Sequence, residues 1–241
     1  MGFLEKIFGN YSEKEIKKIA KSIVYALPST AVLMFHHVTD TPEFTKSGCM
    51  LSSGNFYDVI NYFNNYTSVK DTLKFSFKKR VALTFDDGLS DVFHIAYPFL
   101  KEKQIPFMVF VITDFLDTDG YITTEELKIL AADPLVTIGS HGLSHKVFPK
   151  MTLEEKKREL NLSKEKLETV IGKEVEVFAY SHGQYDKETL SLVKVYKYAF
   201  GVTAVPLLHI MKTVKRYTLP RYNISNDSFE YFKKKLFRYS K

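Results

Sequence analysis

The chain has 241 residues, of which 45% are hydrophobic and 26% are charged, a composition that excludes a disordered or fibrous protein and leaves room for one sizeable core. The formal net charge of +6 would favour an anionic partner, but residues 211–241 alone carry nine Lys or Arg against two acidic residues. The remainder is close to neutral, so we interpret the excess as one solvated basic helix face and expect no nucleic-acid partner.

The single cysteine, Cys49, cannot form a disulfide within the chain, so nothing in the sequence requires an oxidising compartment. Charged residues interrupt every apolar stretch near the amino terminus, and no segment is long and apolar enough to span a bilayer. We therefore expect a cytoplasmic protein without an integral membrane segment. Peripheral contact of the basic C-terminal helix with a membrane surface is the alternative.

Strand-like apolar runs alternate with helical patterns along the chain. Residues 12–27 form an amphipathic helical pattern that ends before Pro28, so we interpret residues 1–30 as an N-terminal helical extension and residues 31–241 as one (β/α) barrel domain. The predicted strands cover 31–35, 81–85, 107–112, 135–139, 175–180 and 199–203, and the predicted helices cover 55–66, 91–103, 123–132, 152–171, 187–196 and 228–239.

This alternation predicts βαβ units and an α/β fold with a parallel sheet, in the form of a distorted, incompletely closed (β/α) barrel of about seven strands. The helix over 152–171 carries its own boundary signals. Thr152 and Glu155 fit a capping box at its start, and Gly172 fits a C-cap at its end.

The strand over 81–85 runs into two adjacent carboxylates, Asp86 and Asp87, which Gly88 follows. A glycine at this point permits a sharp turn. In parallel α/β folds the carboxyl ends of the strands are where ligands and catalytic groups gather. Taken alone, the pair would be interpreted as a turn before the next helix, with Asp91 as a candidate cap.

Two imidazoles, His141 and His145, follow the strand over 135–139. Their spacing of four residues would place them on one face of a helical turn. With a carboxylate from another strand tip they would supply the N,N,O ligand set of hydrolytic zinc and related divalent sites. Asp87 is the predicted carboxylate. Without the acids, a surface histidine pair would be the simplest interpretation, and the absence of H-E-x-x-H argues against a common metalloprotease.

Three segments, 84–88 (TFDDG), 140–145 (SHGLSH) and 178–183 (FAYSHG), resemble the motifs of the polysaccharide deacetylases, carbohydrate esterase family four. The resemblance covers roughly residues 31–224. It implies that Asp87, His141 and His145 hold one divalent metal ion, zinc first and cobalt, nickel or manganese as alternatives. It also implies that Asp86 is the general base for the attacking water.

The third motif departs from the family pattern. Ala179 stands where many members carry an Arg that orients the base. The FAY sequence looks like the branch that includes the poly-N-acetylglucosamine deacetylases, although Ser181 and His182 replace its Pro and aromatic residue. By similarity, Tyr180 and His182 belong to the substrate and oxyanion site, where the backbone N–H of His182 would help to bind the oxyanion.

A general acid must protonate the leaving amine, and histidine suits this role at neutral pH. The sequence FHHV, which contains His36 and His37, resembles the Y-H-x-V pattern of the same branch. We therefore expect His36 to be the acid, with His209 as the alternative and His37 as a packing or hydrogen-bonding neighbour. Arg221 resembles a Pro-Arg element of that branch and would steady Asp86 in place of the missing Arg. A surface ion pair is the other interpretation of Arg221.

The resemblance implies a metal-dependent hydrolase that removes N-acetyl groups from an N-acetylhexosamine-containing glycan or sugar intermediate, so an acetylated amino-sugar glycan is the expected partner. Two alternatives remain open. The altered third motif would also fit a catalytically silent relative that binds glycan or scaffolds other enzymes. The fold and the metal set would equally serve a deacylase of another small amide, because they do not fix the substrate.

Overall fold

The computed structural model describes residues 30–40, 49–73, 80–204, 216–226 and 228. Within these residues seven strands form one sheet in the order β8-β7-β6-β5-β4-β1-β9, and every neighbouring pair is parallel. A separate parallel pair consists of β2 (His37–Val38) and β3 (Met50–Leu51). The sheet strands are β1 (Thr30–Phe35), β4 (Arg80–Phe85), β5 (Phe107–Val111), β6 (Val136–Ser140), β7 (Val177–Ala179), β8 (Phe200–Val202) and β9 (Tyr222–Asn223).

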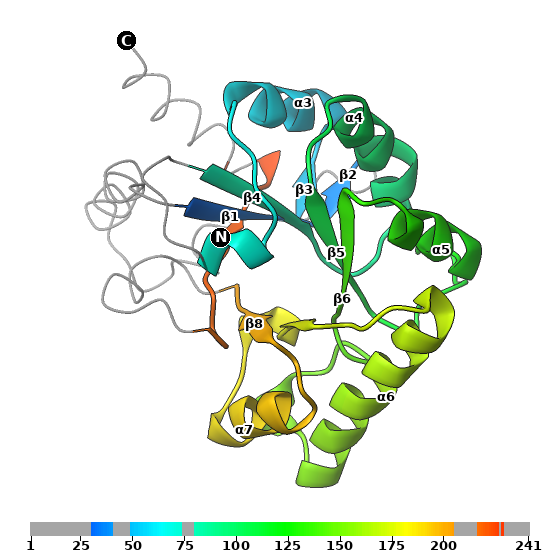
Figure 1. Cartoon of the computed structure of the whole chain (residues 1–241), viewed down its shortest axis with the longest axis vertical. Helices are drawn as coiled ribbons and strands as arrows, with labels where there is room; N and C mark the ends of the chain where they lie inside the picture. Colours follow the sequence, from blue (N-terminus) through cyan, green and yellow to red (C-terminus); the bar gives the residue numbers. More distant parts are fainter. Residues whose placement is uncertain (1–29, 41–48, 74–79, 205–215, 227, 229–241) are drawn as a thin grey trace, which may run out of the picture.

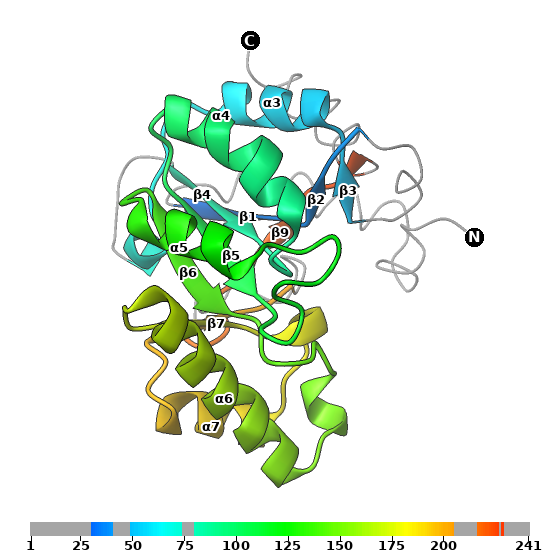
Figure 2. The same cartoon turned by 90° about the vertical axis from the view of Figure 1, so that its right-hand side faces the viewer.

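In the described part of the chain, the helices α3 to α7 follow one another around the outside of the curled sheet (Figures 1 and 2). A π-helical turn, η3 (Val92–Ala96), leads into α4, and none of the described helices combines the length and apolar character needed to cross a bilayer. The predicted helices over 12–27 and 228–239 lie outside the described residues, apart from Ser228. The α-helices are α3 (Ser53–Tyr62), α4 (Tyr97–Glu102), α5 (Thr124–Ala132), α6 (Leu153–Ile171) and α7 (Lys187–Val195), and the 3₁₀ turns are η2 (Lys70–Leu73), η4 (Phe148–Lys150) and η5 (Ser181–Gly183).

The helix boundaries follow the local signals. In α6 the side chain of Thr152 accepts a hydrogen bond from the Glu155 amide, the Glu155 carboxylate accepts one from the Thr152 amide, and Gly172 ends the helix with φ 65°. The helix predicted over 55–66 is shorter, because α3 ends at Tyr62. Tyr66 instead pairs with Val81 beside the sheet.

Strand β1 and strands β4 to β8 are almost entirely buried, which explains their nearly continuous apolar sequences, whereas β9 is half-buried. Leu83 and Val109 belong to the large core cluster to which the helix residues contribute. Their neighbours Ala82 and Met108 belong to a second cluster, built largely from the opposite faces of the strands. The curled sheet therefore has an inner core as well as the core that it shares with the helices.

One segment, 216–223, reaches both edges of the sheet. Leu219 pairs with Val202 of β8, through hydrogen bonds from the Leu219 amide to the Gly201 carbonyl oxygen (2.9 Å) and from the Thr203 amide to the Leu219 carbonyl oxygen (2.9 Å). A few residues later β9 pairs with β1. This segment thus spans the gap between β8 and β1, and Arg221 lies between the two contacts.

Candidate metal centre and active site

The two carboxylates follow β4 at the carboxyl edge of the sheet. The amide of Asp86 still donates to the Phe35 carbonyl oxygen (2.9 Å), so this residue continues the strand pairing, and it is buried. Asp87 and Gly88 both have left-handed backbone conformations, with φ 72° and 74°, which turn the chain sharply. Asp87 is consequently half-buried while its neighbour lies inside. Adjacent carboxylates therefore occupy different environments.

Asp87 converges with His141 and His145. Its Oδ1 atom lies 3.5 Å from the Nε2 atoms of both histidines, and candidate ligand atoms of the three residues all lie within 4.8 Å of one another. Asp87 Oδ1 is buried and has no hydrogen-bond partner within the described part of the chain. A buried polar atom without a partner calls for an explanation.

This donor set fits a divalent ion. Ligand atoms about 2.1 Å from a tetrahedral ion would lie about 3.4 Å apart, close to the separations observed here. The Nδ1 atom of His141 is 2.8 Å from the Ala179 carbonyl oxygen. A carbonyl can only accept, so Nδ1 carries the proton of the neutral ring and Nε2 keeps a lone pair for coordination. The predicted cluster of Asp87, His141 and His145 is thus assembled.

The predicted helical turn between the two histidines is wrong. Residues 141–145 form a loop after β6, in which Gly142 and His145 have φ 83° and 59°. The spacing of four residues still brings the rings together, with centroids 4.8 Å apart, but loop geometry rather than helical periodicity does so. Burial lowers the pKa of His145, and the neighbouring His141 lowers it further, which favours the neutral ring that a metal requires.

Arg221 makes a two-point ion pair with Asp86. Its Nη1 lies 2.5 Å from Oδ1 and its Nη2 lies 2.7 Å from Oδ2, and both side chains are buried. Arg221 also donates to Thr84 Oγ1 (3.1 Å) and to the Thr203 carbonyl oxygen (3.2 Å). Burial alone would raise the pKa of Asp86, but Arg221 and then His141 outweigh it and hold that pKa well below its usual range. The surface ion-pair interpretation of Arg221 is therefore wrong.

His36 follows β1 and adjoins the same acids. Its Nδ1 is buried without a hydrogen-bond partner among the described residues. Burial lowers its pKa, while the charges of Asp86 and Asp87 act in the opposite direction. His37 is a hydrogen-bonding neighbour, with Nδ1 2.7 Å from Asp91 Oδ2. The alternative acid, His209, lies outside the described residues.

The two residues predicted in the third motif, Tyr180 and His182, lie in different environments. The ring of Tyr180 is fully buried and its hydroxyl donates to the Tyr217 carbonyl oxygen (2.9 Å), so its side chain supports the barrel wall and is not accessible to a substrate. His182 is exposed, has φ 56°, and lies with its ring centroid 4.5 Å from that of His145. The side chain that faces the metal cluster from this motif is therefore His182.

Sequence reasoning missed two acidic residues beside the site. The sequence pattern marks Asp91 only as a candidate helix cap, yet its side chain makes no cap bond and instead contacts His37, 54 residues away. Glu159 hydrogen-bonds the loop between the two histidines from α6. In the sequence each is one more acidic residue in a helical pattern, so no local signal marks either contact.

Comparisons with known proteins agree with this geometry. The profile of the family described as polysaccharide deacetylase matches residues 76–201. YxkH of Bacillus subtilis (strain 168), which carries the name of a polysaccharide deacetylase, is 30% identical over 129 residues, covering 54% of this chain and 46% of that protein. The poly-beta-1,6-N-acetyl-D-glucosamine N-deacetylase of Staphylococcus aureus (strain MRSA252) is 27% identical over 173 residues, covering 66% and 59%.

Among solved structures, BC0361, a polysaccharide deacetylase from Bacillus cereus, superposes with a TM-score of 0.72 at 24% identity, covering 86% of this chain and 68% of that one. This likeness supports the distorted parallel barrel. The family profile covers just over half of the chain and includes all three motifs, so the chain belongs to the polysaccharide deacetylase family. The aligned regions span about half the length of the two curated relatives, 46% and 59%. His36 and Arg221 lie outside the profile match.

Proposed function

We propose that this protein is a metal-dependent hydrolase that removes N-acetyl groups from an N-acetylhexosamine-containing glycan or sugar intermediate. The observation that carries the proposal is the pairing of a buried, ionised Asp86 with the adjacent cluster of Asp87, His141 and His145. The name of the Staphylococcus aureus relative supports the choice of substrate class. Two imidazoles and one carboxylate favour zinc, with cobalt, nickel and manganese as alternatives.

A divalent ion in this cluster would supply Lewis acidity, which polarises the acyl oxygen and lowers the pKa of a coordinated water toward about 7. Asp86 has the role of general base. Its low pKa keeps it ionised, and the two-point contact with Arg221 fixes the orientation of its carboxylate. Because a carboxylate with so low a pKa is a weak base, it can take the proton only from an acidified water.

His36 has the role of general acid for the leaving amine. Its lowered pKa means that the ring is neutral near pH 7 and gives up a proton readily once it has received one. The negative charges of Asp86 and Asp87 oppose the effect of burial and favour the protonated form of His36 that a general acid needs. The backbone N–H of His182 would help to bind the oxyanion, as the family resemblance implies.

The test is acetate release from N-acetylglucosamine oligomers with added zinc, cobalt or manganese. We expect release by the wild type, loss of both metal binding and release in His141→Ala, and loss of release alone in Asp86→Asn. Wild-type rates in both variants would refute the proposed function.

The second candidate is a catalytically silent glycan-binding relative. It is favoured by one observation, the replacement of the usual Pro and aromatic residue by Ser181 and the exposed His182 beside the metal cluster. Such a protein would bind the same oligomers in calorimetry without releasing acetate at any metal concentration. Calorimetry run alongside the acetate assay therefore separates the two candidates.

A further inference from the structure

The loop between the two histidines of the metal cluster is held by a buried carboxylate from another element. Glu159 lies on α6 and is buried. Its Oε2 accepts hydrogen bonds from the amides of Leu143 (2.6 Å) and Ser144 (3.1 Å), and its Oε1 accepts one from Ser144 Oγ (2.5 Å). Both oxygens thus accept hydrogen bonds from two of the three residues that separate the histidines.

A second contact from α6 completes the support of this loop. Ser163 lies one helical turn after Glu159, and its Oγ is 2.8 Å from Ser140 Oγ, which accepts a hydrogen bond from the Gly142 amide (3.2 Å). Every amide between the two histidines therefore has an acceptor that α6 provides or positions. Because the loop is not helical, these bonds take the place of the internal bonds that a helix would have supplied.

The backbone of the loop is shaped around the carboxylate. Gly142 has φ 83°, and a Cβ at this position would lie 2.9 Å from Glu159 Oε2. A side chain at position 142 would therefore both strain the backbone and displace the carboxylate. The close approach shows that the carboxylate packs directly against the loop backbone. The loop carbonyl oxygens of Gly142 and Leu143 have separate donors, the amides of Thr113 (3.1 Å) and Asp114 (3.0 Å), so the carboxylate is the support for the amide side of the loop.

We propose that Glu159 is a positioning residue of the metal centre: by accepting three hydrogen bonds from Leu143 and Ser144, it sets the directions in which His141 and His145 present their Nε2 atoms. This inference rests on the proposed function, because it assumes that the histidines bind a metal. Supports of this kind are needed where ligand atoms must be held within a few tenths of an ångström.

The test is the dissociation constant of Zn²⁺, measured by calorimetry on the full chain, for the wild type and Glu159→Gln. Glutamine keeps the volume but removes the negative charge that strengthens all three hydrogen bonds, and its NH2 group at the Oε1 position would have to donate to Ser144 Oγ instead of accepting from it. We expect the dissociation constant to rise by about 10- to 100-fold. The visible absorption of the Co²⁺-loaded protein, which reports ligand geometry, should shift as well.

Glu155→Gln is the matched control. Glu155 lies on the same helix one turn earlier, and its Oε2 accepts from the Thr152 amide (2.8 Å) and Thr152 Oγ1 (2.9 Å), so these hydrogen bonds cap the helix and do not hold the loop between the histidines. This variant should lower the melting temperature without changing the dissociation constant or the Co²⁺ spectrum. If Glu159→Gln fails to fold, Ser144→Ala, which removes one of the three bonds, should show a smaller rise in the dissociation constant.

The outcomes separate the two proposals. The positioning role would be overturned if the wild type binds Zn²⁺ and a folded Glu159→Gln variant binds it equally well. Ser144→Ala takes the place of Glu159→Gln if that variant does not fold. The proposed function would be unaffected by this result. A wild type that binds no divalent ion would overturn both.

Discussion

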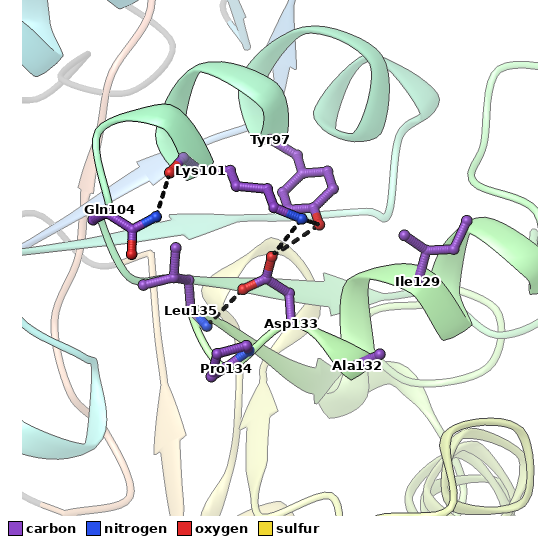
Figure 3. A pocket seen from close by; sticks show the side chains of 8 residues that line it. All are labelled: Tyr97, Lys101, Gln104, Ile129, Ala132, Asp133, Pro134 and Leu135. Carbon is purple, nitrogen blue, oxygen red and sulfur yellow. Dashed lines mark hydrogen bonds and ion pairs between the residues drawn. The ribbon is translucent and has the colours of Figure 1, made fainter.

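The two ends of the sheet each carry a buried acid beside a cation, but only one end is equipped for chemistry. At the carboxyl edge, Asp86 is paired with Arg221 and adjoins Asp87, whose buried Oδ1 has no hydrogen-bond partner among the described residues. At the amino end of β6, Asp133 faces Lys101 and Tyr97 in a hollow of about 590 Å³ between α4 and α5 (Figure 3).

In the hollow both carboxylate oxygens of Asp133 have hydrogen-bond donors. Asp133 Oδ2 accepts from the Tyr97 hydroxyl (2.9 Å) and lies 3.1 Å from Lys101 Nζ, and Oδ1 accepts from the Leu135 amide (3.0 Å). Lys101 is mostly solvated, so this ion pair is screened. The comparison of the two ends shows that an acid paired with a cation beside a sizeable hollow is not sufficient for an active site. The carboxyl edge differs because it brings together atoms that could coordinate a metal ion, among them a buried carboxylate oxygen without a hydrogen-bond partner in the described part of the chain.

The largest expected effect comes from Asp86→Asn. The amide cannot take a proton from water, so the rate of acetate release should fall by about 10²- to 10⁴-fold while Zn²⁺ binding is retained. The measurements are acetate release and calorimetric metal binding. Asp133→Asn, the same substitution at the other end of the sheet, is the control and should leave the rate unchanged. Equal losses of rate in both variants would contradict the comparison.

The next effect comes from Arg221. Arg221→Lys keeps the charge but offers a single ammonium in place of the two-point contact, so Asp86 should lose its fixed orientation and kcat should fall on the order of 10²-fold. Arg221→Gln also leaves a buried carboxylate without a cation and should lower the free energy of unfolding by about 3–5 kcal/mol. Activity assays and urea denaturation measure the two effects, and wild-type kcat in Arg221→Lys would exclude the orienting role.

A smaller effect is expected in the hollow. Asp133→Asn keeps one acceptor oxygen but loses the charge and one acceptor, which should lower the free energy of unfolding by about 1–2 kcal/mol. The burial of Asp133 would by itself raise its pKa, but the Leu135 amide and its side-chain partners hold that pKa below its ordinary value. The stability that Asp133 contributes is therefore present above the pKa of the unfolded chain and should be lost as the pH falls through the lower folded value. Denaturation between pH 3 and pH 7 measures it.

The smallest effect concerns His36 and the pH dependence of stability. Its folded pKa lies below the ordinary value of 6.5, so below about pH 6.5 the unfolded chain binds more protons than the folded one. Stability should therefore decrease as the pH is lowered from 6.5, by at most about 1.4 kcal/mol per pH unit from this residue. His36→Gln should make the decrease shallower. The measurement is the free energy of unfolding between pH 5 and pH 7.5 for the wild type and His36→Gln. If it depends on pH in the same way in both proteins, burial does not lower the pKa of His36.

The sequence by itself determined the elements and the residue types of the site. Strand-like runs, the capping box of Thr152 and Glu155, and the turn at Gly172 depend on neighbours within a few residues, so local rules predicted them. The motif residues Asp87, His141 and His145 were predicted because each ends or follows a strand, and parallel strands bring their carboxyl ends to one edge.

Only the tertiary structure decided how these residues are supported. The family resemblance predicted that Arg221 would steady Asp86, and the structure shows this contact. Only the structure shows how Arg221 reaches Asp86 across 135 residues: segment 216–223 spans the gap between β8 and β1. The histidine spacing suggested a helix, whereas a carboxylate on α6 holds a loop. Contacts of this kind depend on how distant elements pack, and a sequence pattern that fixes each element separately does not fix the distances between them.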